Sequence, residues 1–265
     1  MHLKEKIRRR LPTLGTHVNL RDPIVTEILG SLGFDFLWID MEHVALSEQD
    51  VYHHLLAARS VGTPVLVRVP VDDLTATKRV LEMGVDGIIF PMVQNAQHAK
   101  KLLDHTLYPP YGTRGCGPKS AVRYGLDNEL DFYKEGHLQA LRFVQIEQES
   151  AARDAQNIAA LEHLDGCILG MHDLSGSIHK LGEIFSKENT ALAEMAINAF
   201  TAANKSVGIS TYAIDEETLT RYRDMGINMI STGADYDYIL KLGRQTLTLA
   251  KELMHGKSPK GGTMA

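Results

Sequence analysis

Polar side chains with chemical potential stand at or just after the ends of short apolar runs: Asp40, His43, Arg68, Glu147 and Asp173. Glu147 and Asp173 are hard oxygen donors, which with waters and a chelating substrate can complete an octahedral Mg²⁺ or Mn²⁺ site. Without a metal these two carboxylates would repel each other, and one would have to stay protonated. Arg68 can stabilise an oxyanion beside such a metal. His43, three residues after Asp40, can act as a general acid or base oriented by that carboxylate.

Residues 170–175, with the sequence GMHDLS, have the pattern of a loop that turns into a helix. Backbone amides in such a turn can hold the carboxylate of a substrate. A metal, an arginine and a carboxylate-binding turn together favour a 2-oxo acid that is bound through two oxygens and enolised.

Short apolar runs alternate with longer stretches of helical period, and this alternation indicates a parallel sheet. Most of the runs are apolar throughout, as strands buried on both faces should be. We predict eight strands, at residues 15–18, 36–40, 64–68, 87–90, 142–146, 166–169, 206–210 and 228–232.

Helical patterns separate the strands, with the clearest at residues 47–58, 73–83 and 216–225 and a long last one at 236–254. Ser47 and Asp50 form a capping-box pattern, and Gly84 and Gly226 stand where helices stop. Eight strand–helix units in about 250 residues are typical of an α/β protein of the (β/α)₈ TIM-barrel class, with a doubly wound open sheet as the alternative. We expect a single domain over residues 1–255 and a flexible tail over 256–265.

Composition restricts the function classes. The 265 residues carry 28 Lys and Arg against 33 Asp and Glu, a net charge of −5 that argues weakly against nucleic-acid binding. Two cysteines, Cys116 and Cys167, fit a reducing compartment rather than a disulfide scaffold. The N-terminus lacks the apolar segment of a signal peptide and no apolar run reaches about 18 residues, so we expect a cytoplasmic protein without a membrane partner.

One connection, residues 108–139, is unusually long for a compact domain. Its segment 112–120 resembles a phosphate-binding loop but fails, because Pro118 separates the glycine from the lysine. We predict a loop at the rim of the active site, in which Arg114 and Arg123 either contact substrate or another subunit or are simply solvated. Cys116 in this loop has no base beside it in sequence, which disfavours a catalytic thiol.

Six stretches in order resemble the HpcH/HpaI aldolase family, metal-dependent class II pyruvate aldolases of the phosphoenolpyruvate/pyruvate barrel superfamily. They are GFDFLWIDMEH (33–43), PVLVRVP (64–70), MGVDGIIFPMVQNAQHA (83–99), YPPYGTRGCG (108–117), VQIEQESA (144–151) and LDGCILGMHDLSGSIHKLG (164–182). The C-terminal third matches more loosely, through STGAD (231–235).

The resemblance implies a role for each matching position. Glu147 and Asp173 match ligands of a divalent metal, Mg²⁺ or Mn²⁺ with Co²⁺ as a further candidate. Arg68 matches the arginine that binds the pyruvyl oxygen and stabilises the enolate. His43 matches the catalytic histidine and Asp40 its acidic partner. Glu82 matches an acidic residue that is linked to the site. The segment that holds the pyruvate carboxylate matches Gly170, Met171, His172 and Asp173.

The implied reaction is the reversible cleavage of a 4-hydroxy-2-oxo acid to pyruvate and an aldehyde. Oxaloacetate decarboxylation or cleavage of a CoA thioester would use the same enolate, and a barrel that only binds a metabolite is the non-enzymatic alternative. Family members are typically hexamers, trimers of dimers that exchange the last helix, which suits the long segment 236–254.

Two departures from the family pattern concern specificity. Met171 and His172 replace residues that are usually small, so that His172 can alter specificity, point outward or add a metal ligand. The first strand lacks the tryptophan of several relatives, and His17 or Asn19 can contact a more polar substrate there. Both departures leave the acceptor aldehyde open.

Overall fold

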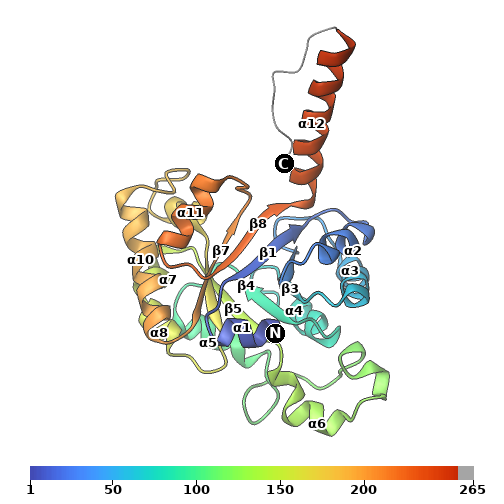
Figure 1. The fold of residues 1–265 in the computed structure, drawn as a ribbon. Coiled ribbons are helices and arrows are strands. Elements are labelled where there is room, and N and C mark those ends of the chain that lie inside the picture. Colours follow the sequence, from blue (N-terminus) through green and yellow to red (C-terminus); the bar gives the residue numbers. More distant parts are fainter. Residues whose placement is uncertain (256–265) are drawn as a thin grey trace.

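The computed structural model describes residues 1–255, and the expected tail at 256–265 lies outside the described residues. Eight parallel strands close into a barrel in which each strand pairs with its neighbours in sequence and β8 pairs with β1 (Figure 1). The strands are β1 (Thr13–Val18), β2 (Phe36–Asp40), β3 (Val65–Arg68), β4 (Gly87–Phe90), β5 (Leu141–Ile146), β6 (Gly166–Leu169), β7 (Ser206–Thr211) and β8 (Met229–Ala234). The predicted TIM barrel is confirmed, and every predicted strand lies within two residues of an observed one.

Helices follow the strands and form the outer layer of the barrel (Figure 1). They are α1 (Leu3–Arg8), α2 (Ile24–Ser31), α3 (Glu48–Val61), α4 (Leu74–Glu82), α5 (Ala96–Asp104), α6 (Glu129–Lys134), α7 (Glu149–Arg153), α8 (Ala155–Ala159), α9 (Met171–Ser177), α10 (Lys187–Ala202), α11 (Glu216–Asp224) and α12 (Asp235–Met254), with 3₁₀ turns η1 (Ser120–Gly125) and η2 (Gly136–Leu138). The capping box of α3 is present as predicted: Ser47 and Asp50 satisfy each other's backbone N–H groups.

Two apolar layers hold the barrel together. The larger one fills the space between the strands and the helices. The smaller one fills the barrel interior and includes Phe36, Trp38 and Phe143, while Leu3 and Ile7 of α1 belong to it and close the end at which the strands begin. Only glycine fits at position 15, because a Cβ there would lie 2.3 Å from the ring of Phe36.

The long connection after α5 is not a rim loop of this chain's active site, contrary to the prediction. Helices of a barrel run antiparallel to its strands, so α5 ends where the strands begin, and η1, α6 and η2 follow at that end. Figure 1 shows α6 at the opposite end of the molecule from α12. Arg123 pairs with Asp127 within this connection. Because Arg114 and Arg123 both belong to the connection, they lie far from the C-terminal ends of the strands of the same chain.

The last helix, α12, extends away from the barrel (Figure 1). It is amphipathic but exposes a row of apolar side chains: Ile239, Leu240, Leu242, Leu247, Leu249, Leu253 and Met254. None of the described helices is long and apolar enough to cross a membrane.

Candidate active site

The strand register brings the predicted polar residues to one mouth of the barrel. Alternate residues of a strand share a face, so Asp40 points inward with Trp38, as Arg68 does with Leu66. Asp40 and Arg68 are direct partners in the pairing of β2 with β3. Gln145 and Glu147, at the end of β5, continue the inward face that begins with the buried apolar residues of that strand.

A buried two-point ion pair joins Arg68 to Asp40. The Arg68 Nε donates to Asp40 Oδ1 at 2.9 Å, and Nη2 donates to Asp40 Oδ2 at 2.5 Å. Burial alone would raise the pKa of Asp40, but the hydrogen bonds and charge of Arg68 hold it below its usual value. The indole of Trp38 lies under the guanidinium, 5.7 Å from its carbon. Arg68 is therefore fixed as a cation at the floor of the mouth.

Glu42 and His43 follow β2 and differ from the predicted arrangement. The imidazole Nε2 of His43 lies 3.7 Å from Glu42 Oε2, and the ring is well exposed. Asp40 accepts the main-chain N–H groups of Glu42 and His43, at 2.9 and 3.4 Å, but no hydrogen bond from the His43 ring. The carboxylate beside the ring is therefore Glu42 and not Asp40.

Glu42 itself is the acidic residue that sequence reasoning passed over. Its Oε2 lies 3.0 Å from Arg68 Nη1, yet this buried oxygen makes no hydrogen bond. Burial raises the pKa of Glu42, with further increases from the charges of Asp40 and Asp173 against the opposing effect of Arg68. Its position between Asp40 and His43, in the sequence DMEH, was the signal that could have identified Glu42 as a residue of the site.

Glu147 is the most perturbed carboxyl group of the mouth. Burial, together with the nearby charges of Glu42 and Asp173, raises the pKa of Glu147 to about 7. Its Oε1 accepts the backbone N–H of Met92 at 2.5 Å and its Oε2 accepts the amide of Gln145 at 2.7 Å. Gln145 was also missed, although its position two residues before Glu147 places it on the same strand face.

The turn after β6 completes this side of the mouth. A Cβ on Gly170 would lie 2.4 Å from Glu147 Oε2, so the glycine leaves the space that this carboxylate occupies. Asp173 stands in the first turn of α9 and is exposed, as is His172, whereas Met171 is buried. The structure thus brings Gly170 and Glu147 together and leaves the predicted roles of Met171, His172 and Asp173 as predictions.

The donor set of the mouth fits a divalent cation. Glu147 and Asp173 can provide oxygen ligands, and the charge of Asp173 is one of the neighbours that raise the pKa of Glu147 after burial. Within residues 1–255 no three His, Cys, Asp or Glu side chains form a preformed metal cage. A cation held by two carboxylates would keep open positions for water and for the oxygens of a substrate, as Mg²⁺ commonly does.

His17, on β1, faces the same mouth but offers no free ring nitrogen. Its Nδ1 lies 2.8 Å from the carbonyl oxygen of Gly233, and its Nε2 lies 2.9 Å from Ser210 Oγ. Burial lowers the pKa of His17 to about 4, so the ring is neutral. Its ring is 1% exposed and packs against those of Trp38 and Tyr212, whose centroids lie 5.3 and 5.0 Å away. Asn19 is half-buried nearby, with its N–H bound to an Asp235 carboxylate oxygen.

Glu82 is the predicted residue that the structure does not bring to this mouth. It ends α4 and therefore lies at the end of the barrel where the strands begin. Its Oε1 is 3.6 Å from the position that a Cβ on Gly117 would occupy, within the long connection. Glu82 is therefore not brought to the mouth of its own chain, and its predicted catalytic role stays a prediction.

Comparisons with known proteins agree with this fold. The family model described as HpcH/HpaI aldolase/citrate lyase matches residues 13–241. A hydroxypyruvate/pyruvate aldolase of Agrobacterium fabrum is 33% identical over 232 residues, covering 88% of this chain and 86% of that protein. A 4-hydroxy-2-oxo-heptane-1,7-dioate aldolase of Shigella flexneri is 31% identical, covering 88% and 86%.

A solved structure gives the same answer for the fold. The HpcH/HpaI aldolase/citrate lyase family protein of Burkholderia cenocepacia superimposes with a TM-score of 0.87 at 28% identity, covering 94% of this chain and 98% of that one. The family match and the aldolase relatives place the chain among the carbon–carbon lyases. The chain belongs to the HpcH/HpaI aldolase/citrate lyase family, and it is an aldolase.

Proposed function

We propose that the protein is a divalent-metal-dependent aldolase that forms a pyruvate enolate and reversibly cleaves a 4-hydroxy-2-oxo acid to pyruvate and an aldehyde. The observation that carries the proposal is the buried Arg68 cation, which Asp40 fixes in the same mouth as the carboxylates of Glu147 and Asp173. Glu147 and Asp173 would hold the metal, Mg²⁺ or Mn²⁺. When bound, it would act as a Lewis acid toward the oxygens of the 2-oxo acid.

Arg68 orients and stabilises the oxygen that becomes negative on enolisation. The Nε of Arg68 and one N–H of its Nη2 donate to Asp40. Its Nη1 donates to Gln145 Oε1 at 3.3 Å and lies beside the carboxylate of Glu42. The second Nη2 hydrogen has no partner among the side chains that the structure describes, and we assign it to the substrate oxygen. Because Asp40 already fixes the guanidinium, the donor needs little reorganisation during the reaction.

His43 transfers the proton at C3 of the 2-oxo acid. Its ring is exposed at the mouth and lies beside Glu42, which can stabilise the protonated imidazole. The turn that begins at Gly170 is the proposed place of the substrate carboxylate, next to the carboxylate of Glu147. Pyruvate or oxaloacetate is the proposed 2-oxo acid, and the relatives' names add hydroxypyruvate as a donor to be tested.

We also propose that the chain assembles into a homo-oligomer, a hexamer built as a trimer of dimers. The support is α12, which extends from the barrel and exposes a row of leucines that water alone would cover in a monomer. Light scattering of the full chain should give a mass of six chains, and a mass of one chain would contradict the proposal.

The function is tested by metal removal. Protein stripped with a chelator and supplied with 4-hydroxy-2-oxopentanoate should release no pyruvate, and Mg²⁺ or Mn²⁺ should restore the release. Equal activity of the stripped, folded protein would overturn the proposal and would point to an imine mechanism, which borohydride trapping of a lysine adduct would detect. Exposed Glu129 provides the matched control, because Glu129→Gln should not alter metal activation whereas Glu147→Gln should.

A further inference from the structure

A strained turn of the backbone lies at the catalytic mouth, between β4 and α5. Met92 in this turn has a φ of 54°, in the left-handed region that residues other than glycine seldom adopt. A methionine is unfavourable in this conformation, which persists only where the surrounding structure holds it. The turn therefore needs a restraint that maintains it and a contact that makes it useful.

Hydrogen bonds from the residues after it provide the restraint. The Gln94 side chain donates through Nε2 to the carbonyl oxygen of Met92 at 3.0 Å, and the Gln94 backbone N–H donates to His98 Nδ1 at 3.3 Å. Because Nδ1 accepts, the hydrogen of the neutral ring is on Nε2, which donates to Asp72 Oδ1 at 2.7 Å. Asp72 belongs to the connection between β3 and α4, so the turn is fixed to a neighbouring loop of the mouth.

The useful contact is with Glu147, at the end of the next strand. The backbone N–H of Met92 donates to Glu147 Oε1 at 2.5 Å, and the Gln145 side chain donates to Oε2 at 2.7 Å. With one donor on each oxygen the carboxylate is held in one orientation, and each oxygen keeps a further lone pair. The left-handed φ lets the chain turn from β4 into α5 while the N–H of Met92 stays directed at Glu147.

We propose that Met92 is a positioning residue, whose left-handed backbone orients Glu147 for a divalent cation. The inference rests on the proposed function, in which Glu147 is a metal ligand. Hydrogen bonds that orient a ligand residue are commonly worth 10- to 100-fold in metal affinity. The side chain of Met92 has a contact of its own, because its Sδ lies 3.5 Å from Gln148 Nε2. The experiment must therefore separate the main chain from the thioether.

Calorimetric titration of the metal-stripped protein with Mn²⁺ makes this separation, with circular dichroism as the check on folding. Glycine and asparagine adopt a left-handed φ but lack the thioether, so Met92→Gly and Met92→Asn should bind Mn²⁺ within about twofold of wild type. Valine is apolar, but its branched Cβ makes a left-handed φ least favourable, so Met92→Val should bind at least tenfold more weakly. Similar losses in all three variants, or wild-type affinity in Met92→Val, would overturn the proposal.

A further variant covers the case in which Met92→Val does not fold. Gln94→Ala frees the Met92 carbonyl from an exposed position, and it should weaken Mn²⁺ binding by about threefold, the effect of one hydrogen bond. Gln97→Ala, which changes an exposed glutamine in the first turn of α5, is the matched control and should leave the affinity unchanged. In that case, equal affinities of Gln94→Ala and Gln97→Ala would overturn this inference alone. Wild type that binds no Mn²⁺ would overturn the proposed function together with it.

Discussion

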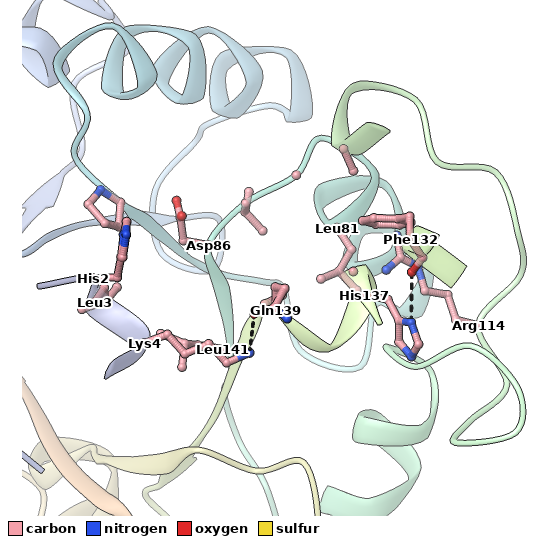
Figure 2. A pocket seen from close by; sticks show the side chains of 16 residues that line it. His2, Leu3, Lys4, Leu81, Asp86, Arg114, Phe132, His137, Gln139 and Leu141 are labelled. Atoms are coloured by element: carbon pink, nitrogen blue, oxygen red, sulfur yellow. Dashed lines mark hydrogen bonds between the residues drawn. The ribbon is translucent and has the colours of Figure 1, made fainter. Parts of the chain in front are cut away.

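The two ends of the barrel carry their buried arginines in different ways. At the catalytic mouth Arg68 is paired on two edges, with Asp40, Glu42 and Gln145 around it. At the opposite end Arg114, which Figure 2 shows beside Phe132 and His137, is equally buried, but its Nε and Nη2 have no hydrogen-bond partner among the described residues. Carboxylates position the first guanidinium, whereas the second packs over the ring of Tyr108.

The difference follows from where each residue stands in the chain. Arg68 ends a strand, so the sheet register delivers Asp40 and the β5 residues beside it. Arg114 stands in a long connection, where no repeating register supplies a partner. Strand ends therefore position charged side chains in advance, whereas the connection at the other end leaves an arginine without a polar side-chain partner among the described residues.

The largest expected effect separates the two ends by their arginines. Arg68→Ala should lower kcat/KM for aldol cleavage by about 10³-fold, or about 4 kcal/mol, because the oxyanion loses its fixed donor. Steady-state kinetics measure the change, and circular dichroism checks folding, because Asp40 is left as an unpaired buried charge. Arg123→Ala at the other end should retain full activity, and a loss there similar to that of Arg68→Ala would break the comparison.

The next effect concerns the carboxylate that we assign to the metal. Glu147→Gln keeps the shape of the side chain but removes the ligand charge, and it should weaken Mn²⁺ binding and kcat/KM by about 100-fold, or about 2.7 kcal/mol. Titration calorimetry with Mn²⁺ gives the affinity. Glu129→Gln in α6 should leave the Mn²⁺ affinity at the wild-type value, and an unchanged affinity in Glu147→Gln would contradict the assignment.

His17 should make stability depend on pH. Burial lowers its pKa from about 6.5 in the unfolded chain to about 4 in the folded one, so below pH 6.5 the unfolded state binds more protons. This neutral histidine therefore contributes stability above pH 6.5 that is lost as the pH falls toward 4, with about 2 kcal/mol lost by pH 5. Urea unfolding at pH 8 and pH 5 should show a smaller difference for His17→Gln than for wild type, and an identical difference would refute the assignment.

The smallest effect compares two helix caps. Ser47 caps the long, packed α3 and Asn128 caps the short α6, each through a side-chain oxygen that accepts a backbone N–H. Ser47→Ala should reduce the free energy of unfolding by about 1 kcal/mol. Asn128→Ala should reduce it by less, because α6 has no buried residue and can fray without disturbing the core. A larger loss for Asn128→Ala would show that the connection is more firmly packed than we infer.

Much of the fold could be predicted because strands that are buried on both faces consist almost entirely of apolar residues. Runs such as Phe36–Asp40 and Gly87–Phe90 are buried on both faces, and the chain shows this as unbroken apolar stretches. The placement of residues 108–139 was mistaken for a different reason. Their length suggested a functional rim, but the helix before them, α5, decides to which end of the barrel they return.

The contacts of the site could be predicted for residues that end a strand. They could be predicted less well for side chains that follow a strand and have more than one possible partner. Asp40 and Arg68 meet because they are register partners. The ring of His43 lies beside Glu42, while Asp40 accepts from Arg68 and from the main chain of Glu42 and His43. Which carboxylate lies beside the ring depends on three-dimensional geometry and could not be predicted from the spacing of the residues.

The central claim is that the mouth built by Arg68 and Glu147 enolises pyruvate with the help of a divalent cation. Exchange of the C3 protons of pyruvate in D₂O, followed by proton NMR without any aldehyde, isolates that step. We predict no exchange with metal-stripped protein, rapid exchange after Mg²⁺ or Mn²⁺ is restored, and none above background in Arg68→Ala. Folded wild-type protein that exchanges no protons with either metal would contradict the account.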